Sequence, residues 1–253
     1  MTPDLAAEDL ARLYPELGRS ETLQSILQTA VHQAGHGLDV LPERAPGWWR
    51  CGARVDGDSR TTNVLLGTAE RAFIVNFRER GVMMARGTTT SLDAVVSAIG
   101  AWQSGTTLAR LKSACPFVGH GPLAEAHERG DAVEAQWTRY RHTAARHVDH
   151  ELIEAAYARP RLRALFPFHS HLTLNFSRCT GFPYTHDIPV ITPANGSYRV
   201  TWWHTRSPDG PADIGEVGTP DDAVALVVGL LPDNCGPAVA GTAEDLDDSP
   251  STR

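Results

Sequence analysis

Residues 90–102 read TSLDAVVSAIGAW, and residues 219–231 read TPDDAVALVVGLL. The two segments align without a gap and share Thr, Asp, Ala, Val and Gly at five of thirteen positions. Each begins like a helix, because Thr90 or Thr219 can act as the N-cap and an Asp follows three residues later. Pro220 supports the second start, since proline is favoured at the first helical position. The match indicates an internal duplication, although unrelated amphipathic helices can also share five positions.

Similar elements lie upstream of each repeated helix. Alternating apolar and polar residues predict strands at 49–55 or 61–67, 73–77 and 82–86 in the first half, and at 171–178, 198–202 and 212–217 in the second. A helix opens each half, at 22–34 and at 150–157. The pattern predicts an α+β fold of two α-β-β-β-α units, each with an antiparallel sheet covered by helices.

The flanking segments complete the expected domain organisation. We expect an acidic, loosely attached segment at 1–20, the first repeat at 21–118, a helical linker at 119–148, the second repeat at 149–240 and a disordered acidic tail at 241–253.

The composition of the chain limits the kinds of protein and of binding partner that need to be considered. The chain has 253 residues, 42% of them hydrophobic and 21% charged, which is ordinary for a soluble globular protein. A net charge of −7 argues against nucleic acid as a partner, because phosphate binding requires a basic surface. The sequence has neither an apolar run long enough for a membrane span nor a signal peptide pattern, so we expect a cytoplasmic protein. Its four cysteines are spaced singly and are expected to be free thiols.

Residues 168–189, FHSHLTLNFSRCTGFPYTHDIP, concentrate titratable and hydrogen-bonding side chains on a strand and the turn after it. Alternation places one set of side chains on an apolar face, namely Leu172, Leu174 and Phe176. The other face is polar and carries His171, Thr173, Asn175 and Ser177. We expect His171 and Asn175 to contact a substrate.

Arg178 ends this strand and precedes a loop shaped by Gly and Pro, which suits an anion anchor. Tyr184, His186 and Asp187 are candidate acid–base groups in that loop, with Asp187 orienting His186. In the alternative interpretation, Arg178 pairs with Asp187 and only fastens the loop. Cys179 is either a nucleophile or a buried core residue.

A second candidate site lies at the end of the strand 73–77. There, Arg78 would hold a carboxylate and Glu79 would transfer protons. The alternative is a solvated hairpin tip, whose Arg–Glu pairs contribute little. The corresponding strand end of the second half carries Trp203, whose ring would line a ligand pocket or, alternatively, pack between sheets.

Eleven histidines raise the question of a metal site. His32 and His36 are four residues apart on a predicted helix, as are His147 and Glu151. None of these pairs has a third ligand in a recognised motif such as HExxH, so we expect no metal. No glycine-rich nucleotide or flavin motif occurs either, and we expect no cofactor and no redox reaction.

Three segments of the second half resemble a known family. They are FPFHSHLTLNFSRCTGFPYTHDIPVITP at 166–193, GTPDDAVALVVGLLP at 218–232 and CGPAVAGT at 235–242. Over residues 160–242 the chain resembles an actinobacterial family of unknown function that is labelled only as natural product biosynthesis proteins. The resemblance implies a cytoplasmic protein encoded beside secondary-metabolite genes, and it implies no particular reaction or catalytic residue.

These features favour a cofactor-independent biosynthetic enzyme that acts on a small secondary-metabolite intermediate. One anion clamp and nearby proton-transfer groups suit an acid–base condensation or cyclisation, for example a Pictet–Spengler-type ring closure. The alternative is a non-catalytic binding or chaperone-like accessory protein of a biosynthetic pathway. We expect a small-molecule partner, neither nucleic acid nor membrane, and we leave a homodimer open.

Overall fold

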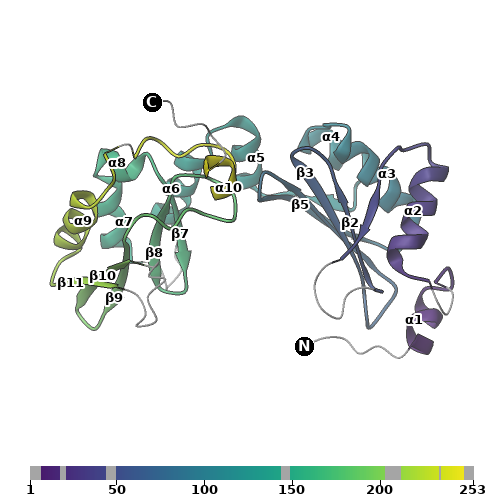
Figure 1. Cartoon of the computed structure of the whole chain (residues 1–253), viewed down its shortest axis with the longest axis horizontal. Coiled ribbons are helices and arrows are strands. Elements are labelled where there is room, and N and C mark those ends of the chain that lie inside the picture. The colour runs from purple at the N-terminus through teal and green to yellow at the C-terminus, as the bar shows by residue number, and fades with distance from the viewer. Residues whose placement is uncertain are drawn as a thin grey trace. The chain divides into compact units, whose positions relative to one another are not determined.

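The computed structural model describes residues 7–17, 21–43, 50–143, 149–202, 212–233 and 235–247. The chain divides into two compact units, Met1–Glu128 and Arg129–Arg253, called here the first and the second unit. Each unit contains one antiparallel sheet together with helices, so the predicted α+β class is confirmed (Figure 1).

The first unit is built on a six-stranded sheet in which each strand pairs with its neighbour in the chain. Its strands are β1 (Val40–Pro42), β2 (Gly52–Asp56), β3 (Arg60–Leu66), β4 (Phe73–Glu79), β5 (Val82–Thr89) and β6 (Val118–Gly119). Its helices are α1 (Ala7–Leu13), α2 (Leu23–Gln33), α3 (Leu92–Gln103), α4 (Leu108–Ala114) and α5 (Pro122–Arg129), the last of which reaches the boundary between the units.

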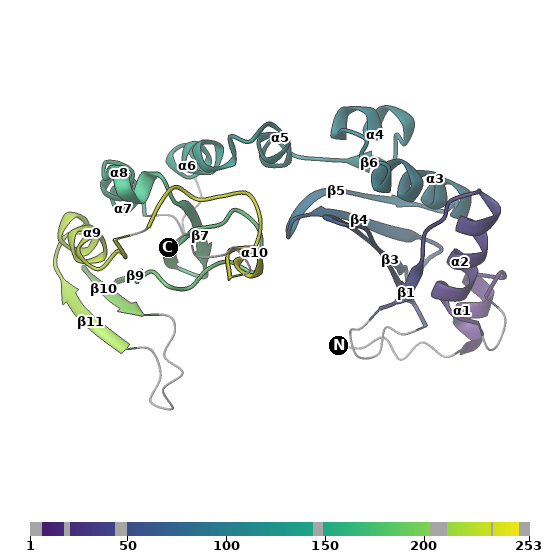
Figure 2. The ribbon, with the colours of Figure 1, turned by 45° about the horizontal axis from the view of Figure 1, so that its top comes forward.

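The alternation along β4 separates the two faces of this sheet. Phe73, Val75 and Phe77 are fully buried and belong to the hydrophobic core. Helix α3 lies against β3, β4 and β5 on this side (Figure 2). Its Trp102 meets the Phe77 ring edge-on at 5.8 Å. The intervening residues of β4 therefore point away from the helices.

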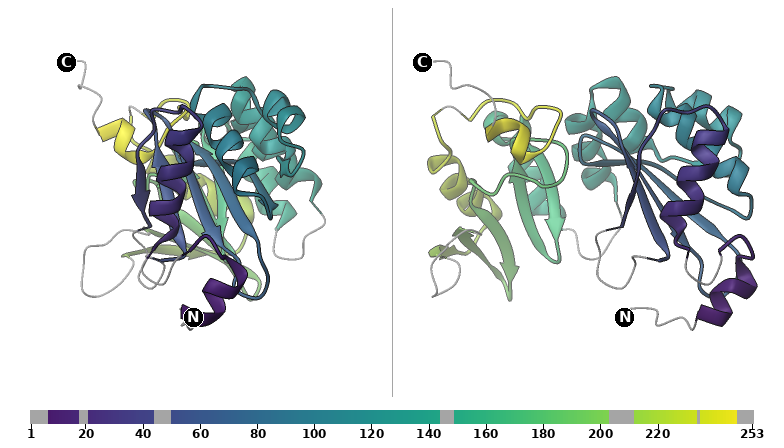
Figure 3. Two further views of the ribbon diagram at one scale, coloured as in Figure 1. Left: turned by 90° about the vertical axis from the view of Figure 1, so that its right-hand side faces the viewer. Right: turned by 45° about the vertical axis from the view of Figure 1, so that its right-hand side comes forward.

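The second unit has a five-stranded sheet with the order β11-β10-β9-β8-β7. Its strands are β7 (Phe166–Ser170), β8 (Thr173–Ser177), β9 (Val190–Ala194), β10 (Ser197–Trp202) and β11 (Ala212–Val217). Its helices are α6 (Ala132–His142), α7 (His150–Tyr157), α8 (Pro160–Arg163), α9 (Pro220–Gly229) and α10 (Ala243–Asp247). The core brings Trp137 of α6 and Val224 of α9 together with Phe176 of β8. Helix α9 packs on β9, β10 and β11 (Figure 3).

The repeated helices α3 and α9 both begin at a hydroxyl N-cap, but not at equivalent residues. Thr219 accepts a hydrogen bond from the Asp222 amide and donates one to its carboxylate at 2.7 Å, as predicted. In the first unit the N-cap is Ser91, which accepts from the Ala94 amide, and the prediction of Thr90 was wrong by one residue. Thr90 instead lies outside the helix, and its carbonyl accepts a hydrogen bond from Arg71.

The sheets contain more strands than the predicted three per unit. Both alternatives at 49–55 and 61–67 correspond to strands, β2 and β3. The segment 171–178 is shorter than predicted, because His171 has a φ of 56° and forms a turn with Leu172 before β8 begins. The hairpin before β8 adds the strand β7, which was not predicted because Pro167 interrupts the strand pattern in the sequence. Proline is tolerated there because β7 is an edge strand of the sheet.

The linker 119–148 is helical as predicted, and two other flanking segments differ from expectation. The linker 119–148 contains two helices, α5 and α6, separated at Gly130 with a φ of 86°, a conformation that favours glycine. The tail 241–253 contains the short helix α10. The segment 1–20 is not loosely attached where it is described, because three of its side chains are buried in the core: Leu10, Tyr14 and Leu17.

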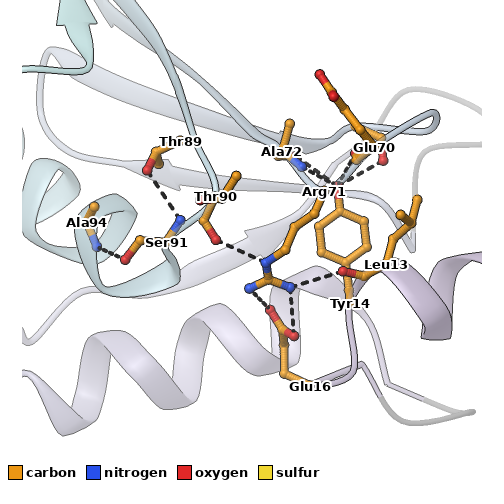
Figure 4. A network of polar contacts seen from close by, with 11 residues as sticks. Leu13, Tyr14, Glu16, Glu70, Arg71, Ala72, Thr89, Thr90, Ser91 and Ala94 are labelled. Carbon is orange, nitrogen blue, oxygen red and sulfur yellow. Dashed lines mark hydrogen bonds and ion pairs between the residues drawn. The ribbon is translucent and has the colours of Figure 1, made fainter.

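Tyr14 and Arg71 fasten this N-terminal segment to the sheet (Figure 4). The Tyr14 hydroxyl accepts a hydrogen bond from the Ala72 amide at 3.0 Å and lies 2.9 Å from two carbonyl oxygens, Gly67 and Ala72, to one of which it donates. Arg71 donates to both carboxylate oxygens of Glu16, at 2.7 and 3.0 Å. Burial alone would raise the pKa of Glu16, but the hydrogen bonds and charge of Arg71 hold that pKa below its ordinary value.

We predict that Tyr14→Phe lowers the free energy of unfolding of the first unit by about 1–3 kcal/mol, because it leaves the buried Ala72 amide without its acceptor. Urea-induced unfolding of the full chain measures this loss. Tyr157→Phe is the matched control, because the Tyr157 hydroxyl donates to Glu134 in an exposed position, and its cost should stay within about 0.5 kcal/mol. Equal losses in the two variants would show that the Tyr14 hydroxyl does not anchor the segment.

Candidate functional site

The polar face of β8 is covered rather than available to a ligand. Thr173, Asn175 and Ser177 are all buried, as are the apolar residues Leu174 and Phe176 on the other face. The loop after β8 folds back over the polar face, and Tyr184 stacks on Phe168 of β7 with ring centroids 4.3 Å apart. The polar residues of β8 therefore serve internal hydrogen bonds.

Ser177 is the centre of those internal hydrogen bonds. Its hydroxyl accepts from the Cys179 amide at 3.1 Å and from the Thr185 amide at 3.2 Å, which brings the two ends of the loop together. The Thr185 hydroxyl in turn accepts from the Arg178 amide at 2.9 Å. Asn175 donates to the Thr173 carbonyl within its own strand.

Arg178 and Asp187 form an ion pair across the loop. Both Nε and Nη2 of Arg178 lie 2.7 Å from Oδ2 of Asp187. Oδ2 of Asp187 accepts these hydrogen bonds from Arg178, and the orientation of His186 by Asp187 stays a prediction. The geometry matches the interpretation in which this pair fastens the loop.

The segment before α10 closes the loop from outside. Val239 forms a parallel bridge with Cys179, and its carbonyl accepts a hydrogen bond from the Thr180 amide at 3.0 Å. The Gly181 amide donates to the Gly241 carbonyl at 2.7 Å. Cys179 is fully buried beneath these contacts, which places it in the core rather than in the position of an accessible nucleophile.

Two further candidates of the second unit, Tyr184 and His186, both meet the ring of Phe168. Burial raises the pKa of Tyr184, which keeps its phenol protonated at neutral pH and unsuited to act as a base. His186 meets the Phe168 ring edge-on at 6.5 Å. His171 is exposed in the β7–β8 turn. Trp203 lies outside the described residues.

Arg78 and Glu79 cannot serve one site in the first unit, because neighbouring residues of a strand point to opposite faces. Glu79 forms an ion pair with Arg60, whose Nη2 lies 3.2 Å from Oε2 of Glu79. Arg60 also stacks over the Trp102 ring at 4.0 Å and donates to the Trp102 carbonyl. Glu79 therefore stabilises the core face of the sheet, whereas Arg78 lies on the face opposite the helices.

That opposite face is hollowed between β4, β5 and the segment after β6. The hollow has a volume of about 780 Å³, and all of its lining residues belong to the first unit. We call it the β5 hollow. Its polar lining includes Asn76, Arg86, Thr88 and His120, and its larger apolar residues are Ile74, Met83, Met84 and Phe117.

The register across the sheet places Arg86 directly opposite Asn76, and Met83 opposite Arg78. Arg78 is two positions from Asn76 on the same face of β4, beyond a shift of the β4–β5 register between Phe77 and Arg78. Neither Arg78 nor Arg86 makes an ion pair within the part of the chain that the structure describes. By contrast, Arg54, which lies on the same line of cross-strand neighbours as Asn76 and Arg86, pairs with Asp56 at 2.9 Å. Unneutralised positive charge is thus concentrated at the β5 end of the face.

His120 borders the β5 hollow immediately after β6. Its side chain is only 9% exposed, and Nδ1 lies 3.2 Å from Oε1 of Glu125 in α5. The imidazole and the Glu125 carboxylate are close but do not form a hydrogen bond. Among the described residues, neither ring nitrogen of His120 has a hydrogen-bond partner. Sequence reasoning missed His120 and Arg86, and the only local signal was the glycine on each side of His120.

The histidine pair His32 and His36 does not share a helix face. Helix α2 ends at Gln33, and His36 packs so closely on Gly100 of α3 that a Cβ there would lie 2.3 Å from its ring. In the described ranges, no group of three His, Cys, Asp or Glu residues is arranged to hold a metal ion. None of the described helices is long and apolar enough to cross a membrane.

Comparison with known proteins gives one match. Residues 131–242, less than half of the chain, are similar to a family of unknown function (DUF6193). The match lies within the second unit. No curated protein and no solved structure matches the chain. The family description names no activity, so the link to natural product biosynthesis stays a prediction.

We predict that the Ser177 hydroxyl stabilises the loop more than the Arg178–Asp187 ion pair does. Ser177→Ala leaves two buried amides without an acceptor and should lower loop stability by about 1–3 kcal/mol. Asp187→Asn weakens a partly exposed pair and should cost about 0.2–1 kcal/mol. Amide hydrogen exchange of residues 178–187 measures both losses. A larger loss in Asp187→Asn would contradict the prediction.

Proposed function

We propose that the first unit binds a small organic anion with an apolar body in the β5 hollow. The observation that carries this proposal is the guanidinium of Arg86, which lines the hollow without an ion-pair partner among the described residues. A guanidinium offers a planar fork of donors that matches a carboxylate or phosphate.

The residues around Arg86 suit the same ligand. Asn76 faces Arg86 across the strands and supplies an amide donor and acceptor, and Arg78 lies two positions further along the same face of β4. Both arginines attract an anion, while two flanking side chains, Ile74 and Met83, expose 37% and 38% of their surface on the same face. Methionine adapts its shape to irregular apolar groups, so this rim favours an aromatic or aliphatic acid over a bare inorganic anion.

The contacts of the second unit support binding in preference to catalysis by the predicted loop. Arg178 and Asp187 neutralise each other, and Cys179 is buried. Two of the groups expected to hold an acid and to move protons, Arg178 and Asp187, are therefore paired with each other. A role in secondary metabolism remains a prediction from resemblance, and a protein that binds an acidic intermediate would suit it.

We predict that isothermal titration detects binding of benzoate or phenyl phosphate, and that Arg86→Gln weakens it roughly tenfold, equivalent to about 1.4 kcal/mol. Inorganic phosphate should bind more weakly than phenyl phosphate, because it cannot fill the apolar rim.

Arg110→Gln is the matched control for charge. Arg110 is an exposed residue of α4 and does not line the β5 hollow, so affinity should change by less than about twofold. The proposal fails if neither organic anion binds the full chain, or if the two substitutions weaken binding equally.

A further inference from the structure

The imidazole of His120 lines the β5 hollow, and both of its ring nitrogens are buried without a hydrogen-bond partner among the described residues. Buried polar atoms in proteins are nearly always hydrogen-bonded, and each exception calls for a missing partner. Both ring nitrogens of His120 are buried without a hydrogen bond to any described residue, although Glu125 lies 3.2 Å from Nδ1. A ligand in the hollow can supply the absent partner.

We infer that His120 takes up a proton when the anion enters the β5 hollow and becomes a cationic contact to it. This inference rests on the proposed function and adds to it that the ligand must accept a hydrogen bond from an imidazolium. The proton comes from solvent, binds the free ring nitrogen and is released when the ligand leaves, so no covalent bond in the ligand changes.

The charges around His120 give the direction of this coupling. In the empty hollow, Arg86 of β5 lines the same cavity and disfavours a second cation, whereas Glu125 of α5 favours one. Helix α4, which packs on β6, carries Arg110 and Lys112, both exposed to solvent. A bound anion offsets Arg86 and leaves the imidazole near two negative groups, which favours its protonated form.

The linkage has a definite sign. Because binding takes up a proton, the affinity for the anion must fall as the pH rises over the range in which the complex holds more protons than the free protein. An organic anion held by arginines alone would bind without this dependence, since guanidinium groups stay protonated over the same range. Proton uptake is therefore a specific signature of His120.

The test is calorimetric titration of the full chain with benzoate in Tris and in triethanolamine at one pH. The two cationic buffers have different ionisation enthalpies, so the difference in apparent binding enthalpy gives the number of protons taken up. We expect a clear uptake in the unsubstituted protein and almost none in His120→Gln, which should still bind benzoate with lower affinity. Glu125→Gln should bind with reduced uptake, because it removes the carboxylate beside Nδ1.

His32→Gln is the matched control, because His32 is an exposed histidine of α2 outside the hollow, and proton uptake should be unchanged. Binding with no proton uptake in the unsubstituted protein would overturn this inference and leave the proposed function intact. Uptake that persists in His120→Gln would assign the proton to another group and also overturn it. Absence of benzoate binding would instead overturn the proposed function.

Discussion

Successive side chains of a β-strand point to opposite faces, and this constraint on β4 organises the first unit. Phe73, Val75 and Phe77 face the helices and are fully buried. The residues between them, Ile74, Asn76 and Arg78, are consequently directed to the other face, where the β5 hollow lies. A shift of one residue in the register of β4 would turn Arg78 into the core and turn Phe73 and Phe77 out of it. The core and the candidate binding surface therefore depend on the same register.

The second unit uses its sheet differently. Both faces of β8 are buried, one by the helical core and the other by the loop that carries Tyr184. Polar residues on a doubly covered strand must find partners inside the protein, and Ser177 does so through two amides of the loop. The concentration of polar residues in this segment therefore reflects how the loop is fastened.

Much of the fold could be predicted from the sequence, because hydrophobic periodicity and helix caps are local signals. Thr219 and the alternation of β4 illustrate this. Strands containing proline, such as β7 and β9, lack that signal and depend on pairing with distant segments. The burial of Tyr14 could not be predicted from its neighbours in the sequence either, because its hydroxyl contacts backbone carbonyls more than fifty residues away.

The candidate site was harder to predict than the fold. Arg78 could be identified at a strand end, but Arg86 and His120 are brought together only by the short pairing of β5 with β6. Close approach makes this pairing possible, since a Cβ at Gly87 would lie 2.6 Å from the Phe117 carbonyl oxygen. A glycine in a strand does not by itself reveal which segment crosses it.

The most direct test of the central claim is an NMR titration of the isotope-labelled full chain with benzoate. We predict that the amide signals that shift lie in β4, β5 and residues 117–121, around the β5 hollow. Signals of residues 178–187 should remain in place, because that loop is closed by its own hydrogen bonds. Shifts confined to 178–187, with none around Arg86, would contradict the account and return the binding site to the second unit.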